Sequence, residues 1–214
     1  MIKGVIFDFD GVIVDTEKKR FRDLRQILAK KNISLQQGTF HRLIGKKTEA
    51  FIKEIFPSLP ADTISSMVDE RRKMNMRNIK GNKLLPGIKN LLHHLKSKKY
   101  TLALVTGTKK DLVKTVLETN GLMDYFDLLV TGESFKSSKP DPECYMIALK
   151  RLRLPKEEVV IIEDSAAGVA AGKRLGITVF AIPTYLPKKD LVESDRIFEN
   201  HAEIKKFFMK QEKI

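Results

Sequence analysis

The spacing of hydrophobic residues changes along the chain. Residues 4–10 form a short apolar, β-rich run that ends in acidic residues and Gly11, which predicts a buried strand followed by a turn. From residue 17 to residue 80 the apolar positions repeat at helical spacing, and nothing there predicts a strand. This stretch is therefore expected to form an all-helical block of three or four helices.

Beyond Pro86 and Gly87, helical and extended patterns alternate in units whose lengths suit right-handed crossover connections, which predicts a parallel sheet. The predicted helices span residues 88–98, 111–120, 141–152 and 165–175. The predicted later strands span residues 101–106, 127–130, 158–162 and 178–182. The expected fold class is α/β, with a doubly wound, Rossmann-like parallel sheet and an inserted helical cap. The predicted boundaries are residues 1–15 and 84–214 for the core, and residues 16–83 for the cap.

The composition suits a globular chain of one domain with a small inserted module. The 214 residues are 42% hydrophobic, yet the longest apolar runs are far too short to cross a bilayer, so no membrane partner is expected. Asp8 and Asp10 interrupt the N-terminal apolar run where a secretory signal needs continuity. The single cysteine, Cys144, cannot form an internal disulfide. The protein is predicted to be cytoplasmic and monomeric.

Positive charge is concentrated in the predicted cap. The net charge of the chain is +13, and residues 16–83 hold 17 Lys and Arg against 7 Asp and Glu. This segment has no Trp or Tyr to stack on bases and no recognised binding motif, which argues against nucleic acid as the partner. A solvated helical surface, or attraction of a small anion, is the better interpretation.

Polar residues follow several predicted strands at the same end. Asp8 and Asp10 end the first strand, Thr106 ends the second, and Glu163 and Asp164 follow the fourth. In a parallel α/β sheet these carboxyl ends form one ligand-binding edge. The carboxylates would repel one another unless a cation or protons joined them, and hard oxygen ligands favour Mg²⁺.

The same edge offers groups for an anion. Thr106 and Gly107 supply a hydroxyl and a backbone amide just before a helix, and Lys139 lies in a Lys-Pro-Asp-Pro loop; these groups suit a phosphate. A carboxylate nucleophile, a divalent ion and these donors together predict phosphoryl transfer through an aspartyl-phosphate. An aspartate two residues after the nucleophile can face the same site and serve as acid and base.

Four ordered motifs resemble those of the haloacid dehalogenase superfamily. They are Asp8-Phe-Asp-Gly-Val-Ile-Val-Asp-Thr16, Val105-Thr-Gly107, Lys139-Pro-Asp-Pro142 and Ile162-Glu-Asp-Ser-Ala-Ala-Gly168. The chain looks closest to the helical-cap subgroup, which includes β-phosphoglucomutase-like and phosphoglycolate-phosphatase-like enzymes. Each motif alone also has a structural interpretation as a turn, loop or helix cap, and their order at equivalent strand ends carries the resemblance.

The resemblance implies a role for each motif. Asp8 is the implied nucleophile and Asp10 the implied acid and base, whose backbone carbonyl is also a metal ligand in the family. The implied phosphate-binding residues are Thr106 and Lys139. The implied Mg²⁺ site is formed by Asp8, Asp10, Glu163 and Asp164, with Glu163 acting directly or through water.

The expected function is a magnesium-dependent phosphatase that hydrolyses a small phosphorylated metabolite. The alternatives are a β-phosphoglucomutase-like mutase, a haloacid dehalogenase, and a non-catalytic protein that binds anions or nucleic acid. Dehalogenation needs neither Mg²⁺ nor Asp10, so the intact acidic pairs argue against it. The substrate stays open among sugar phosphates, phosphoglycolate and nucleotides.

Three basic cap residues are candidate substrate contacts. Arg20 stands where the β-phosphoglucomutase-like pattern has a histidine, and its permanent charge cannot act as a proton switch near neutral pH, which favours hydrolysis. Arg20 is expected either to bind a substrate anion or to be exposed. Lys46 and Lys47 follow Gly45 in a place that resembles the family's substrate-specificity loop, and exposed lysines are the alternative.

Overall fold

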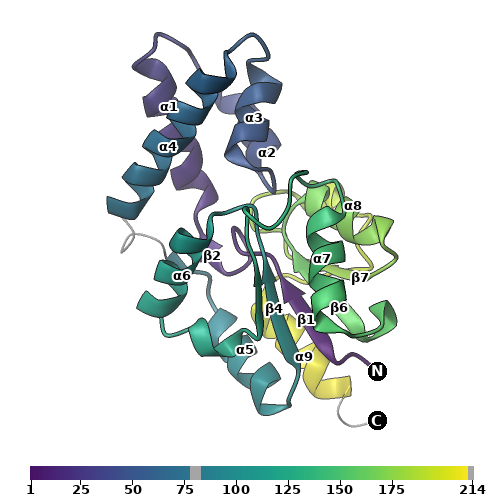
Figure 1. Ribbon diagram of the computed structural model, residues 1–214. Helices are drawn as coiled ribbons and strands as arrows, with labels where there is room; N and C mark the ends of the chain where they lie inside the picture. Colours follow the sequence, from purple (N-terminus) through teal and green to yellow (C-terminus); the bar gives the residue numbers. More distant parts are fainter. Residues whose placement is uncertain (78–82, 212–214) are drawn as a thin grey trace.

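A six-stranded, all-parallel sheet forms the centre of the molecule, seen here in a computed structural model that describes residues 1–77 and 83–211. The strand order is β5-β4-β1-β6-β7-β8, and β1 lies between β4 and β6, with Gly4 opposite Thr101 and Val159 (Figure 1). The strands are β1 (Gly4–Phe7), β4 (Thr101–Val105), β5 (Leu128–Val130), β6 (Val159–Glu163), β7 (Thr178–Ala181) and β8 (Arg196–Ile197).

Helices cover both faces of this sheet and form a separate group above it. The core helices are α5 (Ile88–Ser97), α6 (Lys110–Thr119), α7 (Glu143–Leu152), α8 (Ala166–Arg174) and α9 (His201–Gln211). The inserted helices are α1 (Glu17–Ala29), α2 (Phe40–Leu43), α3 (Thr48–Ile55) and α4 (Ala61–Arg77). Short 3₁₀ helices are η1 (Gln37–Thr39), η3 (Met123–Tyr125), η4 (Lys156–Glu158) and η5 (Lys188–Asp190).

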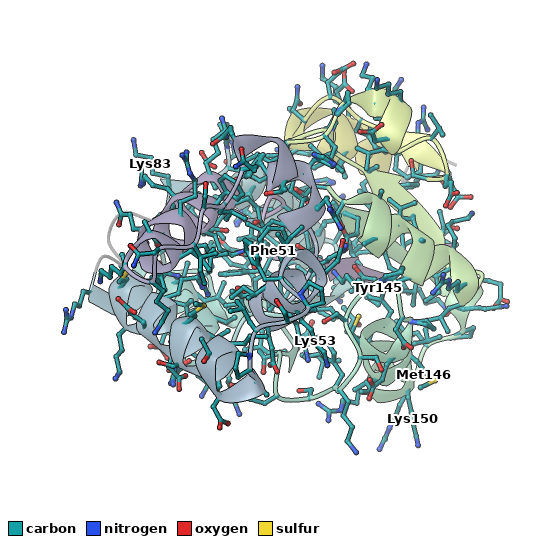
Figure 2. The ribbon with its side chains drawn as sticks, turned by 90° about the horizontal axis from the view of Figure 1, so that it is seen from above. Phe51, Lys53, Lys83, Tyr145, Met146 and Lys150 are labelled. Carbon is teal, nitrogen blue, oxygen red and sulfur yellow. The ribbon has the colours of Figure 1, made fainter. Side chains whose placement is uncertain are left out.

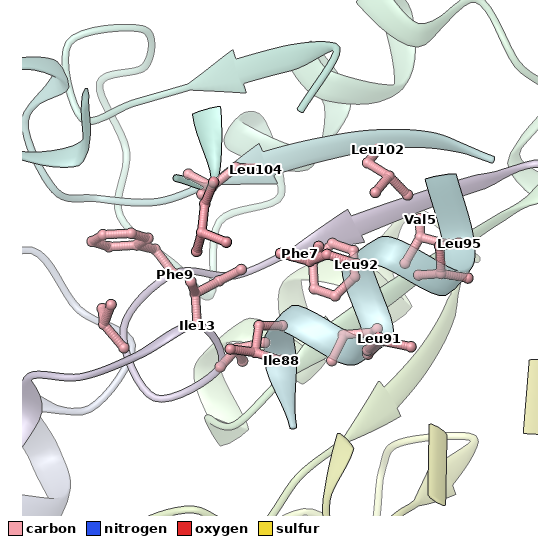
Figure 3. Packing of buried hydrophobic residues seen from close by; sticks show 14 of the residues in the cluster. Val5, Phe7, Phe9, Ile13, Ile88, Leu91, Leu92, Leu95, Leu102 and Leu104 are labelled. Carbon is pink, nitrogen blue, oxygen red and sulfur yellow. The ribbon is translucent and has the colours of Figure 1, made fainter. Parts of the chain in front are cut away.

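Alternating residues of each central strand pack into two different cores. Val5 and Phe7 of β1 point toward α5, α6 and α9, together with Leu102 and Leu104 of β4 (Figure 3). Ile6 points to the opposite face, where α7 and α8 pack against the sheet. Because both faces are covered, β1 is apolar at every position, as expected for a buried parallel strand.

The inserted helices have a core of their own. Its buried residues are Phe21, Leu24, Ile27, Leu28, Leu35, Leu43, Phe51, Ile52, Ile64 and Met67. Phe51 is fully buried among these helices, whereas Met146 and Lys150 project outward from α7 in the core (Figure 2). The helical insertion, which we call the cap, is therefore stabilised by the apolar stripes that the sequence predicts.

The structure confirms the α/β class and adds elements that the sequence analysis did not predict. The first strand ends at Phe7, and Asp8 to Asp10 lie in the following loop. The antiparallel pair β2 (Val14–Asp15) and β3 (Lys83–Leu84) was not predicted, nor were β8 and α9. Residues 78–82, where the predicted helical block ends, lie outside the described residues, and the domain boundaries stay a prediction.

Candidate active site

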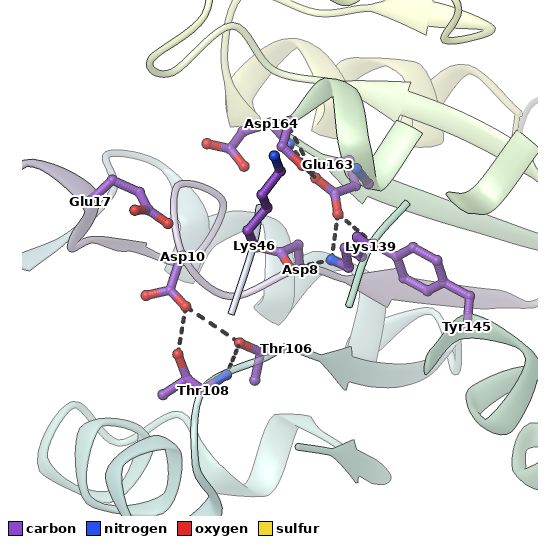
Figure 4. Close-up of polar contacts among 12 residues, drawn as sticks. Asp8, Asp10, Glu17, Lys46, Thr106, Thr108, Lys139, Tyr145, Glu163 and Asp164 are labelled. Atoms are coloured by element: carbon purple, nitrogen blue, oxygen red, sulfur yellow. Dashed lines mark hydrogen bonds and ion pairs between the residues drawn. The ribbon is translucent and has the colours of Figure 1, made fainter. Parts of the chain in front are cut away.

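The loop after β1 carries the predicted nucleophile into a buried position. The Asp8 amide continues the β1–β6 ladder by donating to the Ile162 carbonyl at 3.0 Å, and the residue is 5% exposed. Lys139 Nζ lies 2.6 Å from Asp8 Oδ1 (Figure 4). Burial raises the pKa of Asp8 well above its ordinary value, and the favourable charge of Lys139 offsets only part of that rise.

Lys139 joins Asp8 to Glu163 in the interior. Its ammonium lies 2.5 Å from Glu163 Oε1, and the Tyr145 hydroxyl donates to the same oxygen at 2.6 Å (Figure 4). Burial alone lowers the pKa of Lys139, but the two carboxylates outweigh burial and hold that pKa well above its ordinary value. Lys139 is therefore a permanent cation beside Asp8.

Glu163 is fully buried and fully hydrogen bonded. Its Oε2 accepts from the amides of Asp164 and Ser165 and from the Ser165 hydroxyl, at 2.9–3.1 Å. Burial raises the pKa of Glu163, but Lys139, Tyr145 and Ser165 outweigh burial and lower it below the ordinary value. Glu163 is thus an ionised anchor for Lys139 and for the turn that begins α8. A Cβ at Gly168 would lie 1.8 Å from Glu163 Oε1, so this close packing requires glycine.

Asp164 completes a cluster of acidic groups. Ligand oxygens of Asp8, Glu163 and Asp164 all lie within 4.8 Å of one another. Both Asp164 carboxylate oxygens are buried and have no hydrogen-bond partner within residues 1–77 and 83–211. Burial, with Glu163 and Asp8, raises the pKa of Asp164 well above its ordinary value. Unpaired buried carboxylate oxygens are costly unless a proton or a cation satisfies them, so this cluster has the chemistry of a divalent-metal site.

Threonine hydroxyls hold the second aspartate of the motif. Asp10 Oδ2 accepts from Thr108 Oγ1 at 2.7 Å and from Thr106 Oγ1 at 3.3 Å (Figure 4). Thr16 Oγ1 donates to Asp10 Oδ1. Among the described residues, the Asp10 carboxylate is outside the Asp8, Glu163 and Asp164 cluster. The sequence analysis missed the hydroxyls of Thr16 and Thr108, although Thr108 follows the predicted strand end by two residues.

A cavity of about 170 Å³ separates the cap from this edge of the sheet. Its core side is lined by Asp8, Asp10, Thr106, Gly107, Thr108, Lys109, Leu112, Gly132 and Glu133. Its cap side is lined by Glu17, Arg20, Gly45, Lys46, Lys47, Thr48, Glu49, Val68, Arg71 and Arg72. The cavity is far larger than the roughly 10–15 Å³ that one water molecule needs, so it has room for a small molecule next to Asp8.

Arg20 lines this cavity but has internal partners. Its Nη2 donates to the Leu43 carbonyl at 2.6 Å and to the Lys46 carbonyl at 3.0 Å, and its Nη1 lies 3.1 Å from Glu17 Oε1. The side chain is 8% exposed, so the expectation of an exposed residue is wrong. Arg20 holds the loop between α2 and α3 in place, and substrate contact by Arg20 stays a prediction.

Lys46 and Lys47 also have protein partners. Lys46 Nζ pairs with Glu54 Oε2 at 2.5 Å. Lys47 Nζ donates to the carbonyls of Gly132 at 3.0 Å and Phe135 at 2.7 Å, and lies 4.0 Å from the centre of the Phe135 ring. Lys47 therefore connects the cap to the core loop after β5, and the predicted substrate contacts of both lysines stay predictions.

Two cavity-lining cap residues were missed by the sequence analysis. Glu17 is 0% exposed, and burial raises its pKa to about 7. Arg71 is half-buried, and desolvation lowers its pKa to about 10; its Nε is buried and has no hydrogen-bond partner among the described residues. Glu17 lies three residues before Arg20, and Arg71 lies next to Arg72. Nothing in the sequence indicates that either residue lines the cavity, because a charged residue on a cap helix is ordinarily solvated.

The fold and the site define the class of protein. The family model for haloacid dehalogenase-like hydrolases matches residues 5–182, so the chain belongs to this family and is an enzyme. Among curated relatives, a phosphorylated carbohydrates phosphatase of Thermotoga maritima is 33% identical over 82% of each chain. The β-phosphoglucomutase of Bacillus subtilis is 28% identical over 82% of this chain and 81% of its own.

Solved structures confirm the fold. The crystal structure of β-phosphoglucomutase from Clostridium difficile has a TM-score of 0.87 at 24% identity, over 99% of this chain and 96% of that one. At this identity the likeness concerns the fold alone. In the described part of the chain, none of the helices combines the length and the apolar character that a membrane span requires.

Proposed function

We propose that this protein is a magnesium-dependent phosphatase that hydrolyses a small phosphorylated metabolite through a phosphorylated Asp8. The single observation that carries the proposal is the pairing of Lys139 with buried Asp8, which lines the cavity, next to the Asp164 carboxylate, which has no hydrogen-bond partner among the described residues. The relative named phosphorylated carbohydrates phosphatase supports a phosphatase activity.

The acidic cluster fits a divalent cation. In the proposal, Asp8 and Asp164 bind Mg²⁺ with the backbone carbonyl of Asp10, and Glu163 assists while it holds Lys139. The buried oxygens of Asp164 support this assignment, because no group in the described ranges 1–77 and 83–211 hydrogen-bonds to them and a cation would satisfy them. When bound, Mg²⁺ neutralises negative charge that otherwise opposes attack by a carboxylate on a phosphate dianion.

Lys139 and the strand-end donors prepare the first step. Lys139 occupies Asp8 Oδ1, which leaves Asp8 Oδ2 to attack phosphorus in line with the leaving oxygen. The Thr106 hydroxyl and the Gly107 amide, with Lys139, are the proposed ligands of the phosphoryl oxygens. As the bond from phosphorus to the leaving oxygen breaks, Asp10 gives its proton to that oxygen, and the dephosphorylated alcohol leaves.

The second step uses the same residues in reverse. Asp10, now ionised, takes a proton from a water molecule whose oxygen attacks the phosphorus on Asp8. The bond between Asp8 and phosphorus breaks, inorganic phosphate is released, and Asp8 is again a carboxylate. The hydroxyls of Thr16 and Thr108 hold the Asp10 carboxylate in place for both proton transfers, while the Thr106 hydroxyl turns from Asp10 to the phosphoryl group.

Replacement of the nucleophile tests the proposal. Asp8→Asn is expected to fold normally and to lose at least about a thousandfold in phosphate release, because an amide does not attack phosphorus. Phosphate release from p-nitrophenyl phosphate and from a panel of metabolites measures the loss. The matched control is Asp124→Asn, since Asp124 is exposed and lies outside the cavity. Wild-type turnover in Asp8→Asn would contradict the mechanism.

A further inference from the structure

Two oppositely charged residues on the cap side of the cavity, Glu17 and Arg71, have buried side-chain atoms that find no hydrogen-bond partner in the described part of the chain. Both carboxylate oxygens of Glu17 lack a hydrogen-bond partner, and so does the Nε of Arg71, among residues 1–77 and 83–211. Arg20 Nη1 lies 3.1 Å from Glu17 Oε1, within ion-pair distance but without hydrogen-bond geometry. Such groups are costly in an interior unless a ligand or water completes them.

The neighbouring charged residues do not complete them. Arg72 pairs with Asp111 of α6, and Lys47 is bound to backbone carbonyls of the core. The buried carboxylate of Asp23 is occupied by Lys19 at 3.0 Å and forms no ion pair with Arg71 among the described residues. Arg71 therefore keeps a guanidinium available to a molecule in the cavity.

The position of Glu17 and Arg71 determines which part of a substrate they contact. Asp8 and Asp10 line the same cavity as Glu17 and Arg71. A substrate whose phosphoryl group lies at Asp8 therefore extends its leaving group into the space bounded by these two cap residues. The proposed function places the phosphoryl group, and the following inference rests on it.

We infer that Glu17 and Arg71 form a site for the hydroxyl groups of a polyhydroxylated leaving group, so that the preferred substrates are sugar or polyol phosphates. An ionised carboxylate only accepts hydrogen bonds and a guanidinium only donates them, whereas a hydroxyl does both. Neighbouring hydroxyls on one carbon chain thus satisfy Glu17 and Arg71 together.

Other leaving groups match this pair less well. A carboxylate or a second phosphate would bind Arg71 but would also lie close to the buried carboxylate of Glu17, which repels a second anion. An alkyl chain would displace water and leave both groups without partners. Loss of a hydrogen bond to a buried charged group lowers kcat/KM by about ten- to a hundredfold.

Three phosphate monoesters of six-carbon chains test the inference with the wild-type enzyme and Mg²⁺. We expect kcat/KM for sorbitol 6-phosphate to exceed that for hexyl phosphate by about tenfold or more, with 6-phosphogluconate below sorbitol 6-phosphate. Equal or better turnover of hexyl phosphate would overturn the inference. A preference for 6-phosphogluconate would also overturn it and would show an anion-binding site instead.

Variants assign the preference to the two residues. Glu17→Gln and Arg71→Met are each expected to reduce the ratio of kcat/KM for sorbitol 6-phosphate over hexyl phosphate by about tenfold. The matched control is Glu70→Gln, because Glu70 adjoins Arg71 on α4 but pairs with Lys30 outside the cavity and should keep the wild-type ratio. An unchanged ratio in both cavity variants would overturn the assignment.

Binding separates this inference from the proposed function. Calorimetry on Asp8→Asn measures Kd for sorbitol 6-phosphate and for hexyl phosphate without turnover. Tighter binding of sorbitol 6-phosphate supports the hydroxyl site, whether or not the wild type releases phosphate. A wild type that releases no phosphate would reject the proposed phosphatase activity instead. Equal Kd values for the two esters would overturn the hydroxyl site whatever the enzyme hydrolyses.

Discussion

Buried ionisable residues in this protein differ in how completely their charges are satisfied. Glu163 accepts hydrogen bonds from Lys139, Tyr145 and Ser165, and its pKa is lowered. Glu17, equally buried, has an ion pair to Arg20 but no hydrogen bond to its carboxylate among the described residues. The Glu163 carboxylate is thus part of the folded framework, whereas the Glu17 carboxylate carries an unmet desolvation cost.

This cost should be visible in the pH dependence of stability. The pKa of Glu17 is raised to about 7 by burial in the folded state, so the folded state binds its proton more tightly than the unfolded state does. The contribution of Glu17 to the free energy of unfolding therefore falls as pH rises from the ordinary glutamate pKa to about 7. Above about pH 7 this contribution is constant. Between about pH 5.5 and about pH 8.5, this group should remove about 2 kcal/mol from the free energy of unfolding.

Chemical denaturation of wild type and Glu17→Gln across this pH range measures the effect. The free energy of unfolding of Glu17→Gln relative to wild type should rise by about 2 kcal/mol from the acidic to the alkaline end. Subtracting the wild-type free energy of unfolding from that of Glu17→Gln at each pH removes the effect of groups that titrate in both proteins, including Asp8 and Asp164. A difference that does not change with pH would show that Glu17 has an ordinary pKa.

At the scale of elements, the loop between α2 and α3 connects the cap to the catalytic edge. Arg20 of α1 binds two carbonyls of this segment, and Lys47 binds two carbonyls of the loop after β5. Arg72 of α4 adds an ion pair to Asp111 of α6. The cap is therefore fastened over the cavity by polar contacts at two places, and such contacts can be broken without unfolding either core.

Lys47→Met should weaken this fastening. The side chain keeps its length over the Phe135 ring but loses both hydrogen bonds, so kcat/KM is expected to fall by up to about a hundredfold, because each lost charged bond is worth about 1.5 kcal/mol. Steady-state kinetics with p-nitrophenyl phosphate measures the change. Lys53→Met on α3 is the matched control, because Lys53 is exposed (Figure 2) and lines no part of the cavity. Identical kinetics in both variants would show that the contacts do not support closure.

In the proposed mechanism, the acceptor of the phosphoryl group on Asp8 depends on the residues that α1 presents to the cavity. Arg20 is always charged and bound to the carbonyls of Leu43 and Lys46, so it cannot act as a proton switch that delays water until a sugar acceptor binds. With β-glucose 1-phosphate and a bisphosphate primer, free phosphate should appear and glucose 6-phosphate should not accumulate. Coupled assays for both products measure the partition, and primer-dependent glucose 6-phosphate would establish the mutase instead.

At the scale of the whole molecule, charge is distributed unevenly between the two parts. Residues 16–83 carry 17 Lys and Arg against 7 Asp and Glu. The described cap helices of this segment lie above a core site rich in carboxylates (Figure 1). Several of these cations are paired on the surface, as in Lys30–Glu70 and Arg42–Glu54, but the excess of positive charge remains. We expect this field to attract phosphate dianions toward the cavity.

Salt should therefore slow substrate capture. Coulomb attraction is screened over about 8 Å at physiological ionic strength, so kcat/KM for a dianionic substrate should fall as salt is raised from about 0.02 M to about 0.5 M, while kcat changes little. Initial rates below and above KM separate the two constants. A flat kcat/KM, for a substrate whose capture is rate limiting, would show that the cap charges are only a solvated surface.

The sequence alone determined the α/β class, the helical insertion and the edge of the sheet that holds the candidate site. Hydrophobic spacing distinguishes buried strands from amphipathic helices, and parallel strands bring their carboxyl ends together wherever each lies in the chain. Asp8, Lys139 and Glu163 therefore meet, although 131 residues separate Asp8 from Lys139. These relations follow from local patterns and sheet topology.

The packing of the folded chain sets which charged side chains have protein partners and which are available to a ligand. Lys47 binds carbonyls 85 and 88 residues away, and the burial of Glu17 depends on how α1 and α4 close over the core. A helical pattern places a charged residue on a face of its helix but does not say what covers that face. Desolvation and partner choice depend on packing between distant segments, so the roles of Glu17, Arg20 and Arg71 emerge only in the folded chain.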